Sequence, residues 1–225
     1  YFCIDTFTPI TGNAWKAARH AVDCALTAAE AVLAGERLAY ALVRPPGHHA
    51  EVENAMGFCF INNIAVAVKL SGKRTLVVDI DGHHGNGTEA IFLGDPNVTY
   101  VSLHRIHNYP GTGYVSRANA INVPLPPRCG GERYVEALEE ALERAGRDHE
   151  ELAISVGFDT YKDDPLASLG LEVEDYYSIG YVLGGLGLPT FCVLEGGYVP
   201  EIMGPAAHAF LSGLTEGGAR TGPQD

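Results

Sequence analysis

Short apolar segments alternate with longer amphipathic ones along this chain of 225 residues. Short runs rich in Val, Ile and Leu are typical of strands that are buried on both faces of a parallel sheet. The predicted strands are 38–43, 75–80, 98–103, 152–156 and 190–194. The predicted helices are 14–34, 60–70, 87–93, 132–145, 174–186 and 205–211. Strands that alternate with helices in this way predict an α/β fold, in which a mostly parallel sheet carries helices on both faces.

Several residues mark the ends of these elements. Asn13 is a suitable N-cap for the first helix, and Gly35 and Gly72 are suitable ends for the first two helices. The segments 44–57 and 104–120 are rich in polar residues, Pro and Gly, and are predicted to be loops. Because the chain has no internal repeat and no low-complexity linker, we expect a single domain over 1–225.

Composition narrows the class of protein. Hydrophobic residues make up 46% of the chain and charged residues 19%, which is ordinary for a globular protein and argues against disorder. The formal net charge of −13 repels nucleic-acid phosphate, so we expect no nucleic-acid partner. The same charge favours a cationic ligand such as an amine, although an acidic, soluble surface is the simpler explanation.

Cysteine usage and hydropathy bear on the compartment. The five cysteines are scattered and form no Cys-x-x-Cys pair, which is typical of reduced thiols in a cytoplasmic protein. No apolar run approaches the roughly 18–20 residues that a membrane span needs, and no signal peptide is visible. We therefore expect a cytoplasmic protein without a membrane partner.

Polar clusters follow several of the predicted strands, at the point where each strand ends. They are His48 with His49, the segment 79–86, Asp159 and Tyr198. In a parallel sheet covered on both faces, ligands bind outside these carboxyl ends. The convergence of the clusters on one rim of the sheet is stronger evidence for a functional site than any single cluster.

Asp81 and His83 leave a predicted strand together, and Asp159 follows another strand. Alternate side chains along a strand point the same way, so the first two residues can project to one side. Carboxylate oxygen and imidazole nitrogen suit a borderline divalent metal such as zinc. Three protein ligands leave a position open for water or substrate, as in catalytic zinc sites. Asp159 taken alone also suits an ordinary turn.

The adjacent imidazoles of His48 and His49 suit general acid–base chemistry near neutral pH. Each ring needs a partner on its other nitrogen, and Asp79 and Asn86 flank the predicted metal ligands closely enough to serve. A carboxylate partner would hold His48 more cationic, and an amide would leave His49 nearer to neutral. Tyr198 lies in a glycine-rich turn, where a phenol can donate a hydrogen bond to a developing oxyanion.

These segments resemble the histone deacetylase family, which includes bacterial acetylpolyamine amidohydrolases. The resemblance extends over nearly the whole chain, with the motifs in family order. The motifs are Arg44-Pro-Pro-Gly-His-His-Ala50, Gly57-Phe-Cys-Phe-Ile-Asn-Asn63, Val78-Asp-Ile-Asp-Gly-His-His-Gly-Asn-Gly-Thr88, Val101-Ser-Leu-His104, Tyr109-Pro-Gly-Thr-Gly113, Gly157-Phe-Asp159, Asp164-Pro-Leu166 and Leu194-Glu-Gly-Gly-Tyr198.

The resemblance implies the three-layer arginase–deacetylase fold and a zinc-dependent amide hydrolase that removes acetyl or other acyl groups from an amine. It implies that Asp81, His83 and Asp159 bind Zn²⁺, with Fe²⁺ as the alternative in the cell. Family members also often bind K⁺ beneath the zinc loop, through main-chain oxygens near Asp79, Asp81 and His83 and through Ser102.

The resemblance also implies catalytic roles. His49 acts as general base and then as general acid, while His48 gives electrostatic support. Asp79 and Asn86 orient the two histidines, and Tyr198 polarises the acetyl carbonyl and stabilises the oxyanion. Asn86 is an amide where one branch of the family has Asp, so the class II-like branch is the closer match.

Phe58 and Tyr109 match the aromatic walls of the family's substrate tunnel. The carbonyl of Gly57 matches a group that contacts the substrate amide, and Asp5 aligns loosely with an acidic residue at the rim. A narrow apolar slot suits the methylene stem of acetyl-lysine or of an acetylated polyamine. Both substrates, and other small N-acetylated amines, stay open here, with a slight preference for the small amine.

Family catalytic domains usually carry a further stretch before the position of Tyr1, and we expect that stretch to be lacking. The chain is then either a fragment, or a minimal variant whose missing tunnel wall comes from a partner subunit in a homo-oligomer. A catalytically silent module that binds acyl-amines with the same metal site is the alternative function. An arginase-type hydrolase with two manganese ions needs extra Asp-x-His-x-Asp clusters that the sequence does not contain.

Overall fold

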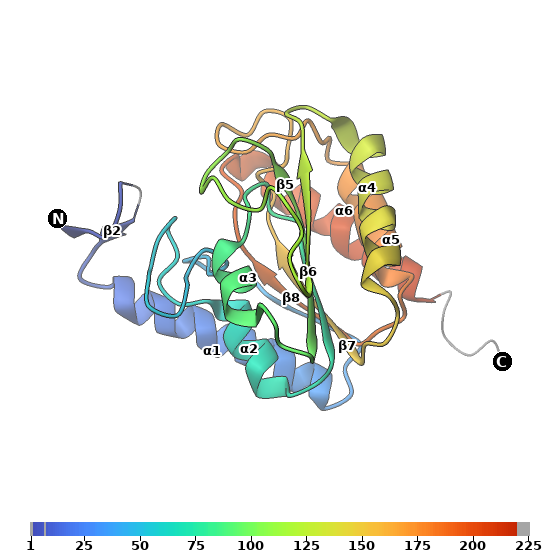
Figure 1. The fold of residues 1–225 in the computed structure, drawn as a ribbon, viewed down its shortest axis with the longest axis horizontal. Helices are drawn as coiled ribbons and strands as arrows, with labels where there is room; N and C mark the ends of the chain where they lie inside the picture. The colour runs from blue at the N-terminus through green and yellow to red at the C-terminus, as the bar shows by residue number, and fades with distance from the viewer. Residues whose placement is uncertain (1, 7, 220–225) are drawn as a thin grey trace.

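Six parallel strands form the central sheet of the molecule (Figure 1). The computed structural model of the protein describes residues 2–6 and 8–219. Every neighbouring pair in the sheet is parallel, which confirms the predicted α/β architecture. The strands lie in the order β3 (Leu38–Ala41), β8 (Thr190–Leu194), β7 (Glu151–Val156), β4 (Thr75–Asp79), β5 (Val98–Arg105) and β6 (Ala120–Leu125).

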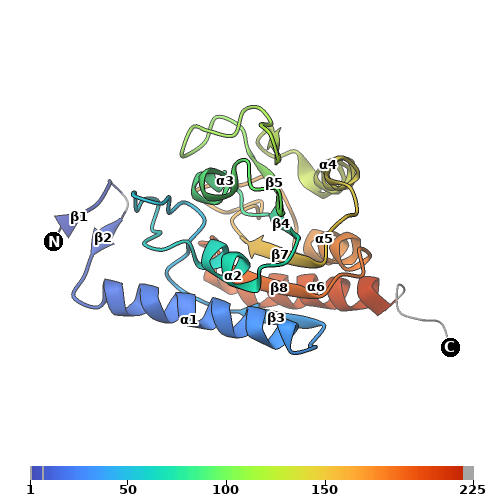
Figure 2. The same ribbon diagram turned by 60° about the horizontal axis from the view of Figure 1, so that its bottom comes forward.

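Helices cover both faces of this sheet (Figures 1 and 2). One layer contains α1 (Ala14–Leu33), α2 (Asn63–Ser71) and α3 (Asn86–Phe92). The other layer contains α4 (Gly130–Ala145), α5 (Asp175–Gly184) and α6 (Pro200–Ala219). The central strands are mainly apolar because alternate residues enter opposite cores. In β8, Phe191 packs toward α1 and α2, and Cys192 packs toward α4, α5 and α6.

Helix ends show where local sequence decides the structure. The side chain of Asn62 accepts a hydrogen bond from Ala65 N at 3.0 Å, so α2 begins after Asn62 rather than at the predicted residue 60. Gly72 ends the same helix in the left-handed conformation, with φ of 64°, as predicted. The prediction for Asn13 is wrong in one respect, because its side chain makes no capping hydrogen bond to α1.

Four elements differ from the sequence prediction. Strand β6 was not predicted, because Asn122 and Pro124 interrupt its apolar pattern. Proline is tolerated there because β6 lies at the edge of the sheet. Short strands β1 (Phe2–Cys3) and β2 (Pro9–Ile10) form an antiparallel hairpin that projects from the body (Figure 2). Helix α6 begins five residues before Pro205, which lies inside the helix rather than at its start.

The order of strands places a topological switch point between β4 and β7. From β4 the chain passes through α3 to β5 and β6, whereas from β7 it passes through α5 to β8 on the other side of β4. Loops that leave two such strands diverge to opposite sides and open a crevice at their carboxyl ends. The fold therefore places the residues after β4 and β7 at the position where ligands bind in α/β proteins.

Two predictions concern the chain as a whole. No helix within residues 2–6 and 8–219 is long and apolar enough to cross a membrane. The single domain over 1–225 stays a prediction, and residues 1, 7 and 220–225 of that range lie outside the described residues.

Candidate active site

The three predicted metal ligands lie just beyond the carboxyl ends of β4 and β7. Asp81 and His83 follow β4, and Asp159 follows β7. Their ligand atoms lie within 4.8 Å of one another, and all three side chains are buried. Among the described residues they form the one such group of His, Cys, Asp and Glu side chains, so a second cluster of the arginase type is not found there.

Main-chain donors orient both carboxyl groups of this cluster. Gly196 N donates to Asp81 Oδ2 at 2.6 Å, and Gly82 N donates to Asp159 Oδ1 at 2.7 Å. The other oxygens, Asp81 Oδ1 and Asp159 Oδ2, lie 3.1 Å and 2.8 Å from Nδ1 of His83. Main-chain hydrogen bonds thus orient both carboxyl groups, and such preorganisation of ligands lowers the entropic cost of binding an ion.

The chemistry of this cluster fits a divalent cation. Asp159 Oδ2 is buried and has no hydrogen-bond partner among the described residues, although His83 Nδ1 lies only 2.8 Å away. Burial and the charge of Asp81 raise the pKa of Asp159 to about 7. Such crowding of buried ligand atoms is expected where they share a cation rather than a proton. A side chain at Gly196 would fill this space, since a Cβ there would lie 2.5 Å from Asp159 Oδ2.

His48 and His49 are both buried, and each ring is hydrogen-bonded to one polar side chain. His48, whose partner is a carboxylate, is the more cationic of the two. Its Nδ1 lies 3.0 Å from Asp79 Oδ2, which also accepts a hydrogen bond from the Tyr100 hydroxyl at 3.0 Å. Burial alone would lower the pKa of His48, but the carboxylates of Asp79 and Asp81 hold it well above its ordinary value. The imidazolium form is therefore favoured at neutral pH.

His49 forms the second pair, and its partner is neutral. Its Nδ1 lies 2.8 Å from Asn86 Oδ1, so Nδ1 carries the proton and Nε2 is left as an acceptor. The Asn86 amide in turn donates to Glu51 Oε1 at 2.7 Å, which fixes its orientation. Burial and the neighbouring His48 and His83 lower the pKa of His49 well below its ordinary value. This ring is therefore neutral at neutral pH.

Tyr198 lies beyond the end of β8 and faces the same pocket. Its main-chain N donates to Asp164 Oδ2 at 2.9 Å, and its ring lies 5.9 Å from that of Phe58. Burial, followed by Asp159 and Asp81, raises the pKa of Tyr198, so its phenol keeps its proton at neutral pH. A protonated phenol in this position is a hydrogen-bond donor.

A pocket of about 170 Å³ joins these groups to the surface. It is lined by the aromatic rings of Phe58 and Tyr109 and by His49, His83 and Tyr198. The backbone approaches closely at Gly57 in this wall, where a Cβ would lie 2.5 Å from Cδ2 of His49. The other lining residues are Gly57, Asn108 and Leu166.

Two further predicted residues lie beside the site. Asp5 Oδ2 accepts hydrogen bonds from Gly57 N at 2.9 Å and from the Tyr109 hydroxyl at 3.2 Å, so Asp5 contacts the pocket wall. Ser102 pairs in register with Asp79, and its hydroxyl contacts His104 Nδ1 at 2.9 Å. Potassium beneath the metal loop stays a prediction.

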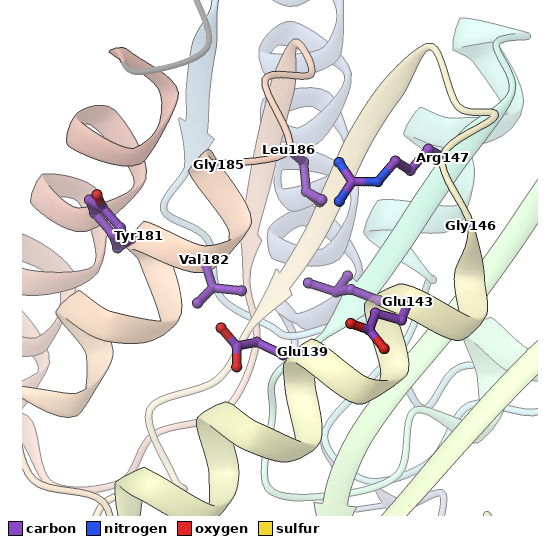
Figure 3. Close-up of a pocket in the computed structure, with 9 residues that line it drawn as sticks. Glu139, Glu143, Gly146, Arg147, Tyr181, Val182, Gly185 and Leu186 are labelled. Carbon is purple, nitrogen blue, oxygen red and sulfur yellow. The ribbon is translucent and has the colours of Figure 1, made fainter.

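A larger hollow, of about 630 Å³, lies elsewhere, between α4 and α5 (Figure 3). Glu139 and Glu143 reach into it from α4, and Val182 and Tyr181 belong to α5. None of its lining residues belongs to the buried clusters described above, and its charged side chains are exposed. Volume alone is therefore a poor guide to the reactive site in this molecule.

Sequence reasoning missed several residues that hold the site together. Glu195 accepts hydrogen bonds from Gly47 N and His48 N, and Glu51 accepts one from the Asn86 side chain. Arg44 donates to the carbonyls of Glu195 and Gly197, in the segment that leads to Tyr198. Glu195 stands directly before the two glycines that precede Tyr198, and an acidic residue in an otherwise apolar strand end was the available signal. No local pattern connects Glu51 to Asn86.

Comparisons with known proteins identify the family of this chain. The histone deacetylase domain family matches residues 2–214. Acetylpolyamine amidohydrolase 1 of Pseudomonas aeruginosa is 40% identical over 237 residues, which covers 98% of this chain and 68% of that protein. Histone deacetylase 15 of Arabidopsis thaliana is 36% identical, over 95% of this chain and 42% of that protein. The solved acetylpolyamine aminohydrolase of Burkholderia pseudomallei superposes with a TM-score of 0.89 at 36% identity, over 93% of this chain and 65% of that one.

The chain belongs to the histone deacetylase family, and its fold is the arginase–deacetylase fold. Within the family it is similar to the acetylpolyamine amidohydrolases. It spans about two thirds of the length of the bacterial relatives named above.

Proposed function

We propose that this chain carries the active site of a metal-dependent amide hydrolase that removes an acetyl group from an amine. The observation that supports this most directly is the meeting of three kinds of group in one pocket. These are a buried Asp–His–Asp cluster, a neutral imidazole at His49 and a protonated phenol at Tyr198. Amide hydrolysis needs an electrophilic centre, a base and an oxyanion donor together.

The metal ligands in this proposal are Asp81, His83 and Asp159, and Zn²⁺ suits their mixed oxygen and nitrogen donors. When bound, such an ion polarises a carbonyl group and lowers the pKa of water. Fe²⁺ accepts the same ligands and is the alternative in the cell.

The side chains of the chain itself supply the proton transfers. Nε2 of His49 accepts a proton from the water that attacks the acetyl carbonyl and later donates it to the leaving amine. His48, held as imidazolium by Asp79, stabilises negative charge that develops beside it. The Tyr198 hydroxyl donates a hydrogen bond to the carbonyl oxygen as that oxygen becomes anionic.

The substrate we favour is an acetylated polyamine or another small N-acetylated amine. The narrow pocket between Phe58 and Tyr109 admits a methylene chain, and the net charge of −13 attracts the remaining ammonium groups of a polyamine. Asp5, at the pocket wall, is placed to contact such a group. The names of the bacterial relatives point the same way, whereas acetyl-lysine in a protein is the competing substrate.

The deciding experiment measures deacetylation of acetylputrescine and of an acetyl-lysine peptide by the zinc-loaded chain, with Tyr198→Phe as control. Turnover that falls about 100-fold or more in the control, with zinc retained, would support the proposal. The ratio of the two rates identifies the substrate class. Bound zinc and an intact fold without any turnover would instead indicate a module that only binds acyl-amines.

A further inference from the structure

Glu195 is a fully buried acid that neither lines the pocket nor belongs to the metal cluster. Its Oε2 accepts hydrogen bonds from two consecutive main-chain groups, Gly47 N at 2.7 Å and His48 N at 3.1 Å. Its Oε1 accepts a hydrogen bond from the Ser155 hydroxyl at 3.3 Å. One carboxyl group thus connects the ends of β7 and β8 to the loop that carries the two histidines.

The segment that follows Glu195 makes further contacts to the same groups. The Arg44 guanidinium donates to the carbonyl of Glu195 at 2.7 Å and to that of Gly197 at 2.9 Å. The next residue, Gly196, donates its N–H to the metal-cluster residue Asp81, and Tyr198 faces the pocket. Residues 195–198 therefore contact the histidine loop and the metal cluster and carry the phenol.

The two N–H groups that Glu195 holds belong to Gly47 and His48, the two residues directly before His49. A reacting group must be held to roughly 0.5 Å for efficient catalysis. Hydrogen bonds from main-chain N–H groups to a carboxylate are among the stronger ones in proteins. Glu195 does not line the pocket, so a substrate bound there is not contacted by its side chain.

We propose that Glu195 is a positioning residue: by holding Gly47 N and His48 N, its carboxyl group fixes His49 relative to the metal cluster and Tyr198. The kinetic test of this positioning role rests on the proposed function. The role requires the carboxyl oxygen of Glu195 to reach both N–H groups. A competing explanation is that the negative charge of Glu195 acts on His48 across space.

Two substitutions separate reach from charge. Glu195→Gln keeps an oxygen where Oε2 lies and turns its amide group toward Ser155 Oγ, which can accept a hydrogen bond. Glu195→Asp keeps the charge but is one methylene shorter, so it cannot reach both N–H groups without moving the loop. Positioning predicts that kcat stays within about 5-fold in Glu195→Gln and falls about 100-fold in Glu195→Asp, with KM changed less than about 3-fold and metal content unchanged. The reverse order, or equal losses, would overturn it.

Glu151 offers a matched control at the opposite end of the neighbouring strand. It is also a buried glutamate, and its Oε1 accepts hydrogen bonds from the Ser71 and Thr75 hydroxyls. Glu151→Asp should lower the thermal midpoint while leaving kcat unchanged. A loss of kcat in Glu151→Asp as large as that in Glu195→Asp would show a general effect of stability and would overturn the positioning role.

A readout without turnover keeps the test independent of the substrate. In ¹H–¹⁵N spectra, the amide protons of Gly47 and His48 should lie downfield in the wild type and in Glu195→Gln, and move upfield in Glu195→Asp. If the wild type hydrolyses neither substrate, the proposed function fails. The Gly47 and His48 resonances then still test whether Glu195 holds the two N–H groups. If Glu195→Asp does not fold, Ser155→Ala replaces it: it should lower kcat about 3- to 10-fold, and unchanged kcat together with unmoved resonances would overturn the proposal.

Discussion

Buried acids lie at both ends of the sheet, but their surroundings differ. At the amino ends of the strands, Glu151 begins β7 and is contacted by the hydroxyl groups of Ser71 and Thr75. At the carboxyl ends, four acids are fully buried together: Asp79, Asp81, Asp159 and Glu195. Hydroxyl donors suffice for an isolated acid, whereas four neighbouring acids call for cationic groups.

The carboxyl ends supply part of that positive charge within the chain. Asp79 and Asp81 hold His48 in its cationic form, and main-chain N–H groups contact Asp81, Asp159 and Glu195. The Asp–His–Asp cluster retains a buried carboxylate oxygen without a hydrogen bond among the described residues. The amino ends thus carry an isolated acid with hydroxyl donors, and the carboxyl ends carry the groups on which the proposed function depends.

Removal of one metal ligand should have the largest effect on activity. It should also distinguish the acids at the carboxyl ends of the strands from Glu151 at the amino end. Asp159→Ala leaves two ligands, so we expect loss of bound zinc after dialysis and a fall in kcat/KM of about 1,000-fold or more. Metal analysis and turnover on acetylputrescine check this together. Glu151→Ala serves as the control and should keep its zinc. Stoichiometric zinc in Asp159→Ala would contradict the assigned ligand set.

Loss of the base should have the next largest effect, without loss of metal. His49→Ala removes the neutral imidazole of the pocket, and general-base groups contribute roughly 10²- to 10⁴-fold to rates. We expect a fall of that size in kcat with zinc content unchanged. The low pKa of His49 also predicts that the wild type keeps its activity as the pH falls to 6, because this ring stays neutral there. Full turnover in His49→Ala would exclude this residue as the base.

Much of this arrangement can be predicted from the sequence, for identifiable physical reasons. Strands buried on both faces are apolar throughout, so β4, β7 and β8 stand out, and Asp81 and Asp159 follow strand ends that a parallel sheet must bring to one rim. The pairing of His48 with Asp79 and of His49 with Asn86 joins segments 31 and 37 positions apart. It could be predicted because both segments follow strands that end at that rim.

The remaining features depend on contacts between distant segments. Glu195 reaches Gly47 across 148 positions of sequence, and Glu51 reaches Asn86 across 35, so no local pattern reports either contact. Strand β6 is hidden because Pro124 and Asn122 interrupt its apolar run, yet the parallel ladder with β5 outweighs that local preference. Tertiary hydrogen bonds, which sequence periodicity does not encode, thus account for these differences.

At the amino ends of the strands, substitution of Glu151 should lower the free energy of unfolding and leave kcat unchanged. Glu151→Ala leaves the buried Thr75 hydroxyl and the Ser71 hydroxyl without this acceptor, which costs about 2 kcal/mol in the free energy of unfolding. We expect that loss in urea denaturation, with kcat on acetylputrescine unchanged. A large fall in kcat with full stability would mean that Glu151 affects the reaction at the opposite end of the sheet, which its hydrogen bonds do not predict.

The smallest effect concerns acid sensitivity at the carboxyl end of β5. His104 Nε2 donates to Gly113 O at 3.0 Å, and Nδ1 faces the Ser102 hydroxyl, while the ring of His84, itself beside Glu89, lies 4.8 Å away. Burial, with His84 next, lowers the pKa of His104 to about 3.

The sign of the pH dependence follows from this low pKa. The unfolded chain binds a proton at His104 below about pH 6.5 and the folded chain does not, so stability falls as the pH falls through this range. His104 should contribute a loss of about 1 kcal/mol between pH 6.5 and pH 5.5. Urea denaturation of the wild type and of His104→Gln at both pH values measures the difference, since the variant keeps an N–H for Gly113 O and cannot titrate. Equal pH dependence in the two proteins would show that His104 titrates alike in the folded and unfolded states, and that the acid sensitivity comes from other groups.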